Sequence, residues 1–376
     1  MAGTSGNSAT RWARVTPNAR KCPTFTSGSV CVVAFNYTGM RLALQKMSPH
    51  TEATMMRYLH MFAVWPIAAT IPAFATTDFP KRPIRFIVPF APGGVSDIIA
   101  RTIAYKTADS LGQPIVIDNR GGAGGTIGAS MFAKAQPDGY TSGTGNISTH
   151  AVAPHMYKRR PYDPIKDFTP VVLAATSPNL IGASPSLPVK TIGELIAYAK
   201  TRPGQFSFAS SGIGTVLHLG GKLLNVMGGI DLVHIPYKGV ALALPDVMSG
   251  KVHLIVDAMI SASGHVRAGR IKALAVTIAK RSQALPDVPT VAESGLPGYE
   301  LDFWIGVYGP AGMPPRVTQL LNTEVNKALK ATDVREKLAA QGADVAGGSP
   351  GKLLEILNID LPRMGKIVNA AKILPE

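Results

Sequence analysis

Two glycine- and serine-rich loops carry the residue pattern best suited to binding a ligand. The first loop, Phe90–Asp97, and the second, Phe208–Thr215, each follow a β-rich run and precede a helical segment. A loop placed in this way presents free backbone N–H groups at the positive end of a helix dipole, which is an anion site. Two such loops facing one cleft would suit an anion with carboxylate groups, although tight turns alone also explain the glycines.

The sequence assembles no catalytic or metal-binding set. The run Gly122–Gly128 departs from a dinucleotide fingerprint because its third glycine is one position late and no acid follows about twenty residues on. Ser210 and Ser211 lack the GxSxG elbow of α/β hydrolases. We therefore expect no enzyme, no catalytic residue, no metal and no cofactor. An exported hydrolase that uses one of these serines remains the alternative from another class.

Histidines are too scattered to form a metal-ligand pattern. None of them has the i, i+4 spacing with an intervening acid that a zinc helix needs: His150, His155, His218 and His234. His218 falls one turn into its predicted helix. It either lines the cleft or is an ordinary buried histidine.

The elements that must position the loops alternate between short strands and helices, which indicates an α/β protein with largely parallel sheets. Strands are expected at 84–90, 115–118, 171–175, 180–183, 206–208, 232–235, 252–256 and 271–276. Helices are expected from Ser96 or Asp97 to Leu111, at 192–200 and 215–227, and through most of the tail, where Pro362 should end the segment 352–359.

Charge and cysteine content limit the classes of protein further. The net charge is +15, but residues 1–75 hold seven Lys and Arg against one acid, and the remaining charges of both signs are interspersed without a long basic block. Interspersed charges indicate a solvated surface, so we expect no nucleic-acid partner. Both cysteines, Cys22 and Cys31, also lie before residue 76. The rest of the chain therefore has no disulfide and no thiolate.

The N-terminal region reads as a processing segment. Residues 61–77 are uncharged, basic residues precede them, and Ala73-Phe74-Ala75 is a signal-peptidase pattern. A membrane-spanning helix is the alternative, but Pro66 and Pro72 interrupt a run that is already short. We expect a signal peptide at 55–75, cleavage after Ala75 and export to the periplasm.

The residues before the signal, 1–54, are more numerous than a secretory n-region requires. We interpret them as a mis-annotated or disordered extension, with translation starting at Met47, Met55 or Met56. The processed chain is then about 300 residues long, which is enough for two domains.

A family resemblance runs through residues 79–376 in order. It is carried by RPIRFIVPFAPGGVSDIIAR (82–101), LGQPIVIDNRGGAGGTIGA (111–129), ASSGIGTVLHLGG (209–221), HIPYKG (234–239) and FWIGVYGPAGMP (303–314). The chain resembles the Bug family of periplasmic solute receptors, the TctC-like binding proteins of tripartite tricarboxylate transporters. This resemblance implies a two-lobed type II periplasmic binding protein fold with a hinge and an interdomain ligand cleft. It implies a first lobe at 78–179 plus 302–376 and a second at 180–301.

The resemblance also implies which residues bind the ligand. They are Phe90, Ala91, Pro92, Gly93, Gly94, Ser96 and Asp97 in the first loop; Asn146, Ser148, Thr149 and His150 in the first-lobe wall; Ser210, Ser211, Gly212, Gly214, Thr215 and His218 in and behind the second loop; and Tyr237, Lys238 and Asp257. Tyr237 and Lys238 are equally explained by a turn with a surface lysine, and Trp304 is expected in the hinge. Departures from the family pattern at Ser142-Gly143, Arg160 and Leu242 leave the ligand's identity open.

The implied function is that of a periplasmic receptor for a small carboxylate. Family members bind dicarboxylates, tricarboxylates, amino acids or aromatic acids through loop backbone groups rather than an arginine clamp. The expected partners are the ligand and inner-membrane permease subunits, and the protein is expected to be a monomer. The alternative within binding proteins is a receptor that presents its ligand to a sensor kinase.

Overall fold

The computed structural model describes residues 79–373. The predicted extension, signal peptide and cleavage site lie outside the described residues. Among the helices described, none has the length and apolar character needed to cross a membrane.

Ten strands of the described chain form one hydrogen-bonded network. Their order is β2-β1-β3-β9-β4-β7-β5-β6, and β10 and β8 also pair with β4. The strands are β1 (Ile84–Val88), β2 (Ile115–Asn119), β3 (Thr141–Asn146), β4 (Phe168–Ala183), β5 (Phe206–Ser210), β6 (Leu232–Pro236), β7 (Leu254–Ala258), β8 (Lys272–Val276), β9 (Asp302–Pro310) and β10 (Asp344–Val345).

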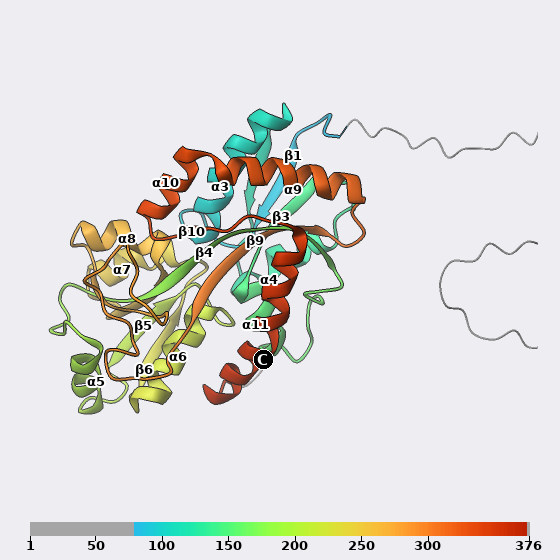
Figure 1. The fold of residues 1–376 in the computed structure, drawn as a ribbon. Helices are drawn as coiled ribbons and strands as arrows, with labels where there is room; N and C mark the ends of the chain where they lie inside the picture. The colour runs from blue at the N-terminus through green and yellow to red at the C-terminus, as the bar shows by residue number, and fades with distance from the viewer. Residues whose placement is uncertain (1–78, 374–376) are drawn as a thin grey trace, which may run out of the picture. The chain divides into compact units, whose positions relative to one another are not determined.

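The long strand β4 divides this network into two groups, as Figure 1 shows. Its first part, Phe168–Pro178, pairs with β9, and Asn179–Ala183 pairs with β7 and β8. We call the group around β1, β2, β3 and β9 the first lobe, and the group around β5, β6, β7 and β8 the second lobe. The change of partners lies beside the predicted boundary at residue 179, and the exact lobe boundaries stay a prediction.

The expectation of largely parallel sheets is correct only for part of each lobe. Strand β1 is parallel to β2 and β3, and β5 is parallel to β6 and β7. All pairings of β4, and that of β3 with β9, are antiparallel. The chain returns between the lobes through β4 and β9, so these two strands run in opposite directions.

The separate strands predicted at 171–175 and 180–183 are one strand. Ser177, Pro178 and Asn179 interrupt the apolar pattern, which is why the sequence reads as two segments. Irregularities of register near Pro170 and Leu173 accommodate the twist of β4 against β9. In this middle section Asn179 Nδ2 donates to the Leu301 carbonyl over 3.1 Å, and its backbone N–H donates to Thr277 Oγ1 over 3.2 Å.

Helices cover the sheet in both lobes (Figure 1). They are α3 (Val95–Leu111), α4 (Thr126–Ala133), α5 (Ile192–Lys200), α6 (Val216–Gly228), α7 (Leu244–Met248), α8 (Met259–Arg267), α9 (Pro315–Lys330), α10 (Thr332–Ala340) and α11 (Pro350–Ala370), with shorter turns η2 (Ala123–Gly125), η3 (Ile147–Val152), η4 (Ala153–His155) and η5 (Val240–Leu242). Helix α3 packs on α9 and β2, and α6 packs on β6 and β7. In each lobe, one strand therefore leads through a loop into a helix: β1 into α3 in the first lobe, and β5 into α6 in the second.

Helix α11 continues through Pro362, where the sequence predicts a break. Its buried positions Leu353, Leu357, Met364 and Val368 keep helical spacing on both sides of the proline, and the helix packs on η3 and β4. This packing outweighs the loss of one backbone hydrogen bond at the proline.

A buried polar link joins α11 to the start of β9. Trp304 is fully buried, and its Nε1 donates to Asp360 Oδ2 over 2.7 Å. Arg363 donates to Asp360 and to Asp302 over 2.7 and 2.5 Å. Asp302 begins β9, so these contacts fix α11 to the crossing between the lobes. The Trp304 side chain is buried near the start of β9, one of the two strands that connect the lobes, and its expected role in the hinge stays a prediction.

Candidate ligand-binding site

A small cavity of about 20 Å³ lies where the two lobes meet. Twelve residues line it: Phe90, Gly94, Val95, Ser96, Asn146, Ser148, Ser211, Leu217, Gly239, Val240, Asp257 and Phe303. They come from the ends of β1, β3, β5 and β7, the starts of α3, α6 and β9, and the turns η3 and η5. The lining contains no lysine or arginine among the residues described. Neutral donors must therefore hold any anion that enters.

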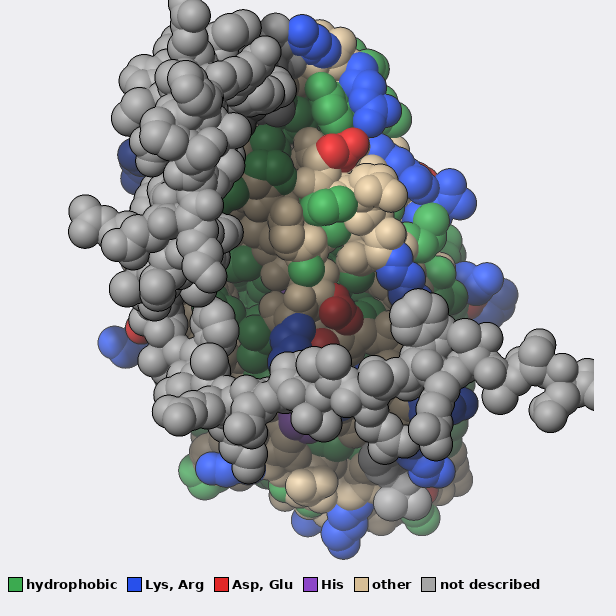
Figure 2. Space-filling model, turned by 90° about the vertical axis from the view of Figure 1, so that its right-hand side faces the viewer, with side chains coloured by type: hydrophobic (Ala, Val, Ile, Leu, Met, Phe, Trp, Pro, Cys, Tyr) green, Lys and Arg blue, Asp and Glu red, His purple; other side chains and the backbone are tan. Residues whose placement is uncertain are grey.

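Basic side chains instead lie on the outer surface of the molecule. Figure 2 shows many of the visible Lys and Arg side chains toward the right-hand and lower margins of one face, whereas apolar and uncharged side chains, with a few charged ones among them, lie nearer its centre. The positive charge can attract anions over a distance, but it does not contact the cavity.

The first loop opens the N-terminus of α3 to the cavity. After β1 the chain turns at Gly93, whose φ of +81° favours glycine, and Gly94 becomes the N-cap in place of the expected Ser96 or Asp97. Gly94 has no side chain, and no side chain caps this helix. The N–H groups of Val95 and Ser96 have no acceptor within the helix. A helix of 17 residues thus points its positive end, uncapped, at the cavity.

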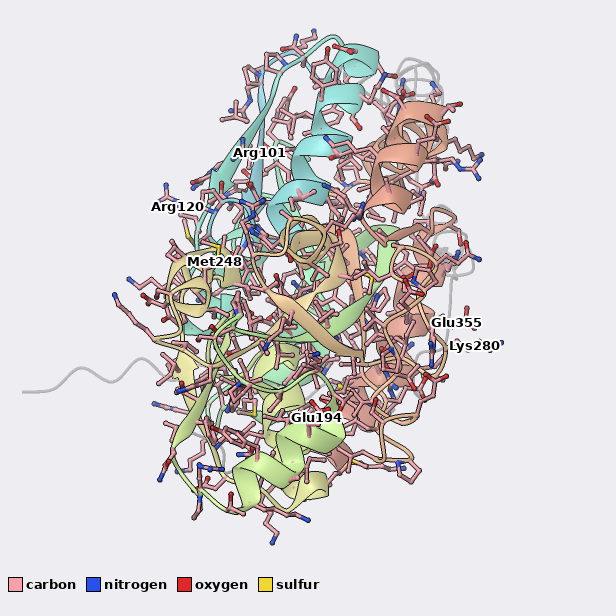
Figure 3. All side chains as sticks on the ribbon, turned by 90° about the vertical axis from the view of Figure 1, so that its left-hand side faces the viewer. Arg101, Arg120, Glu194, Met248, Lys280 and Glu355 are labelled. Carbon is pink, nitrogen blue, oxygen red and sulfur yellow. The ribbon has the colours of Figure 1, made fainter. Side chains whose placement is uncertain are left out.

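Asp97 shapes this loop from behind rather than lining the cavity. Its Oδ2 accepts the Gly93 N–H over 2.9 Å, and its carboxylate accepts hydrogen bonds from Arg101 Nε and Asn119 Nδ2 over 3.0 Å. Asn119 also donates to the Phe90 carbonyl over 3.0 Å. Burial alone would raise the pKa of Asp97, but the hydrogen bonds from Arg101, Gly93 and Asn119 lower it overall. Figure 3 shows Arg101 on the α3 side of the first lobe.

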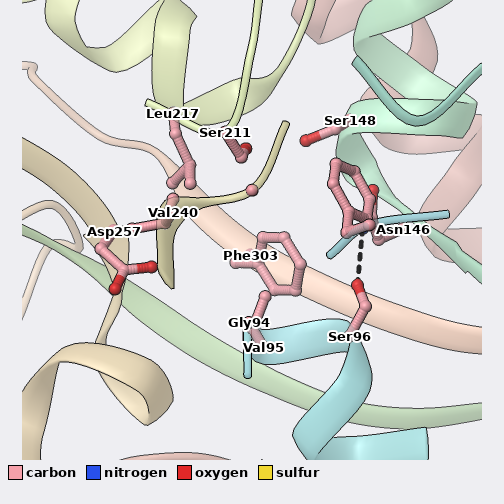
Figure 4. Close-up of a pocket in the computed structure, with 12 residues that line it drawn as sticks. Gly94, Val95, Ser96, Asn146, Ser148, Ser211, Leu217, Val240, Asp257 and Phe303 are labelled. Carbon is pink, nitrogen blue, oxygen red and sulfur yellow. Dashed lines mark hydrogen bonds between the residues drawn. The ribbon is translucent and has the colours of Figure 1, made fainter. Parts of the chain in front are cut away.

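The wall of the first lobe offers hydroxyl and amide groups. Asn146 Nδ2 donates to Ser96 Oγ over 3.2 Å, which Figure 4 marks. Asn146 Oδ1 accepts the Thr149 N–H, and Thr149 Oγ1 accepts the Asn146 N–H, so the two residues form a capping box that fixes η3. Thr149 therefore holds Asn146 in place and does not line the cavity.

His150 lies in the core of the first lobe and not at the cavity surface. It is fully buried, stacks on Tyr308 with ring centroids 4.2 Å apart, and its Nδ1 is 2.9 Å from Thr149 Oγ1. Burial lowers the pKa of His150 to about 3. The imidazole is therefore neutral at physiological pH and acts as packing.

The second loop differs from the first because its helix is already capped. Thr215 Oγ1 accepts the His218 N–H over 3.2 Å, and the Val216 N–H donates across the lobes to Ser148 Oγ over 3.0 Å. Of this loop only Ser211 lines the cavity; Gly212 and Gly214 shape the turn with φ of +123° and +79°. The two helix N-termini are therefore not equivalent: no side chain caps α3, whereas Ser148 and Thr215 accept N–H groups in the first turn of α6.

Ser210 and His218 belong to a buried polar cluster behind the second loop. Ser210 Oγ is 2.7 Å from His234 Nε2 and accepts the Gly212 N–H, and the rings of His218 and His234 stack at 4.2 Å. Ser210 is fully buried and does not line the cavity. The contact with His234 resembles a serine–histidine pair, but no ligand in the cavity would reach it. In the described chain, no cluster of three or more His, Cys, Asp or Glu side chains is arranged to hold a metal ion.

The lobes touch through small residues beside the cavity. A Cβ built on Gly239 of the second lobe would lie 2.8 Å from Ala91 Cβ, and one built on Gly93 would lie 3.4 Å from Ala241 Cβ. A Cβ on Gly124 would clash with the Ile213 carbonyl oxygen. Ala91 and Gly93 thus contact the opposite lobe instead of the cavity.

The remaining predicted residues lie at the rim or are held elsewhere. Pro92 and Lys238 are exposed. The Tyr237 hydroxyl donates to Asp246 Oδ2 over 2.7 Å. Neither Tyr237 nor Lys238 lines the cavity, which favours the turn interpretation of this pair.

Asp257 brings a carboxyl group into the cavity from the end of β7. Its Oδ1 accepts the Ala258 N–H over 2.7 Å and the Ser261 hydroxyl over 2.6 Å. Its Oδ2 is buried and has no hydrogen-bond partner in the described part of the chain. Burial raises the pKa of Asp257 to about 7, against the opposing effect of these two hydrogen bonds.

Of the apolar lining, the sequence singled out Phe90 and missed Val95, Leu217, Val240 and Phe303. Aliphatic and aromatic residues at such positions look like ordinary core. Gly239 belongs to the YKG motif, which was the one available signal.

A comparison of the chain with known proteins shows the family to which it belongs. A family model described as "Tripartite tricarboxylate transporter family receptor" matches residues 99–373. The solved structure of the periplasmic binding protein BugD is 35% identical, with a TM-score of 0.77, and covers 79% of this chain and 100% of that one. The described fold is thus that of a two-lobed type II periplasmic binding protein. The chain belongs to the Bug and TctC family of tripartite tricarboxylate transporter receptors, and the predicted resemblance is confirmed.

Two further relatives were solved with a bound acid. Rpa4515 from R. palustris with adipate is 40% identical, has a TM-score of 0.77, and covers 79% of this chain and 100% of that one. MatC (Rpa3494) from Rhodopseudomonas palustris with bound malate is 36% identical, has a TM-score of 0.75, and covers 77% of this chain and 100% of that one.

Proposed function

We propose that this protein is a periplasmic receptor that captures a small organic carboxylate between its lobes and delivers it to a membrane permease. The observation that carries the proposal is the uncapped N-terminus of α3 at an interlobe cavity. A carboxylate there accepts the Val95 and Ser96 N–H groups and the favourable end of the helix dipole. The relatives solved with adipate and malate support a carboxylate as the ligand.

Neutral hydroxyl groups complete this carboxylate site. Ser96 Oγ already accepts a hydrogen bond from Asn146, and Ser148 Oγ accepts one from Val216, so each hydroxyl hydrogen remains to be donated to a ligand. Ser211 lines the same cavity from the second lobe. Because Ser148 and Ser211 come from different lobes, a ligand that binds both favours the closed arrangement of the lobes.

Delivery to a permease rests on membership of the transporter-receptor family. A receptor that reports to a sensor kinase would use the same site, so the two roles differ only in the partner. Reconstitution with the permease subunits of the same organism distinguishes them: ligand uptake that depends on the receptor supports transport, and its absence supports signalling.

Thermal unfolding of the purified protein with a panel of mono-, di- and tricarboxylates, amino acids and aromatic acids tests the capture step. A ligand at a hundred times its dissociation constant stabilises the fold by about 2.7 kcal/mol, which raises Tm by several degrees. The neutral diamide of each dicarboxylate is the matched control and should give no shift. If no acid shifts Tm, and native mass spectrometry shows no ligand retained from purification, carboxylate capture is wrong.

A further inference from the structure

The carboxyl group of Asp257 is an unusual feature for a cavity that binds anions. It belongs to the lining, it is almost fully buried, and its Oδ2 has no protein donor among the described residues. An ionised carboxylate in this position would repel an anionic ligand and would leave a buried charge unpaired, which is costly. Something in the bound state must supply its partner.

The hydrogen bonds of Asp257 indicate which oxygen carries a proton. Oδ1 accepts the Ala258 N–H and contacts the Ser261 hydroxyl, which also lies within hydrogen-bond distance of the Ala258 carbonyl, so Oδ1 has protein partners and Oδ2 has none. A proton on Oδ2, the oxygen without a protein partner, makes it a hydrogen-bond donor for a bound ligand. Such a donor requires an acceptor, and a carboxylate is the strongest one available.

The position of Asp257 sets the geometry of the ligand. In Figure 4, Ser96, Asn146 and Ser148 gather on one side, Asp257 lies on the other, and Val240 and Phe303 lie between them. The cavity thus has polar groups at two ends and apolar side chains in its middle. A chain of carbon atoms with an acid group at each end matches this distribution.

We infer that Asp257 is a specificity-determining residue that binds in its protonated form, donating from Oδ2 to the second carboxylate of a dicarboxylate whose first carboxylate lies at the N-terminus of α3. The inference rests on the proposed function and narrows its ligand class. The second carboxylate remains ionised and shares the Asp257 proton in a short O–H···O⁻ hydrogen bond. When Asp257 is ionised before binding, the proton comes from solvent.

No titratable side chain on the elements around Asp257 sets the protonation of its carboxyl group, so a bound ligand is the group that should change it. Strands β4 and β5, which flank β7, carry no titratable side chain. Helix α6 carries His218 and Lys222, and α8 carries His265 and Arg267, but none of these four contributes to the pKa shift of Asp257. Burial raises the pKa of Asp257 to about 7 against the lowering effect of the two hydrogen bonds to Oδ1, so the proton can be gained at physiological pH.

A ligand series of matched length tests the class. The dicarboxylates from malonate to suberate are titrated by calorimetry, followed by the monocarboxylate and the ω-amino acid that replace one carboxylate of the tightest binder with a methyl or an ammonium group. We expect the dicarboxylate to bind at least tenfold more tightly than either analogue. A tighter ω-amino acid, with protons released on binding, would show that Asp257 is an ionised partner of a cation and would overturn the inference.

The pH dependence of binding tests the proton. Between pH 7.5 and 9 the Kd of the dicarboxylate should increase about tenfold per pH unit. In this range Asp257 and both ligand carboxylates are ionised, so Asp257 must take up a proton from solvent before the dicarboxylate can bind. Calorimetry at pH 8 in buffers of different ionisation enthalpy should show uptake of nearly one proton. This measurement uses the unaltered protein, so it does not depend on the folding of a variant.

The variant Asp257→Asn supplies the sharpest contrast. Its amide keeps the shape and a donor but cannot titrate, so Kd should become independent of pH and, at pH 9, lower than that of the unaltered protein. Asp360→Asn is the control, since Asp360 is a buried aspartate with a raised pKa that lies outside the cavity lining. It should keep the pH dependence.

The outcomes separate this inference from the proposed function. If dicarboxylates bind with the same pH profile in Asp257→Asn and in the unaltered protein, the role of Asp257 is wrong while carboxylate capture stands. If none of the acids binds at any pH, the proposed function itself fails.

Discussion

The Asp97 carboxylate illustrates a residue that serves the site without touching the cavity. It accepts the Gly93 N–H and joins α3 to the end of β2 through Asn119, so it fixes the path of the loop that presents the helix N-terminus. Its location in the first turn of α3 also adds a favourable interaction with the helix dipole.

Replacing Asp97 by Asn should weaken ligand binding more than an equivalent surface change. One acceptor oxygen becomes a donor that opposes the Gly93 N–H or the Arg101 guanidinium, so we expect about 1–2 kcal/mol less free energy of unfolding and about a tenfold increase in Kd. Denaturant unfolding and calorimetry with the best carboxylate measure both. Asp118→Asn is the control, because Asp118 binds Arg85 and Arg120 on a partly exposed strand. Equal Kd values for the two variants would contradict the positioning role.

At the level of elements, the backbone of the turn η2 in the first lobe directly contacts the backbone of the second loop. Gly124 has a φ of +63°, and its Cα faces the Ile213 carbonyl across the lobes with no room for a side chain. Any added atom must separate the lobes or distort one of the two loops.

Gly124→Ala should therefore reduce affinity by impeding closure. The expected increase in Kd is at least tenfold, and small-angle scattering with saturating ligand should show a larger radius of gyration than the unaltered protein has. Gly112→Ala is the matched control: Gly112 has the same φ of +63°, but a Cβ there meets nothing within 4 Å. Both variants pay a backbone cost of about 1 kcal/mol. If both raise Kd equally, the contact between the lobes is irrelevant to binding.

The sequence predicts elements well where the signal is local. The helix at 192–200 appears with the expected bounds, and the first loop follows its strand as predicted, because glycine, capping residues and apolar spacing act over a few residues. β4 and α11 were misjudged because tertiary pairing and packing override local interruptions at Pro178 and Pro362. Long-range contacts have no local signature.

The same distinction applies to the site. Seven residues implied by the family resemblance do line the cavity: Phe90, Gly94, Ser96, Asn146, Ser148, Ser211 and Asp257. The sequence could not show that His150 and Ser210 turn into the core, because their partners, Tyr308 and His234, are distant along the chain. Nor could it show that Ser148 accepts the Val216 N–H at the start of α6, a contact that exists only when the lobes meet.

For the whole molecule, buried titratable groups act in opposite directions on stability. Burial, which is the largest cause for all three histidines, lowers the pKa of His150 and His234 to about 3 and that of His218 to about 4. These side chains stay neutral in the folded protein while the unfolded chain takes up protons below pH 6.5, so stability is lost as pH falls. The raised pKa of Asp257 has the reverse effect: its contribution to stability decreases as pH rises from about 4 to 7.

The unaltered protein should therefore lose stability on acidification, and Asp257→Asn should lose it more steeply. Between pH 7.5 and 5, His150 alone costs about 2 kcal/mol of unfolding free energy, while neutralising the buried Asp257 returns a similar amount. The asparagine variant lacks that return, so it should be the more stable protein at pH 7.5 and should lose about 2 kcal/mol more by pH 5. Urea unfolding without ligand at both pH values measures the difference. Parallel curves would mean that Asp257 does not titrate in this range, and Asp257 could then not be the group that takes up a proton on ligand binding.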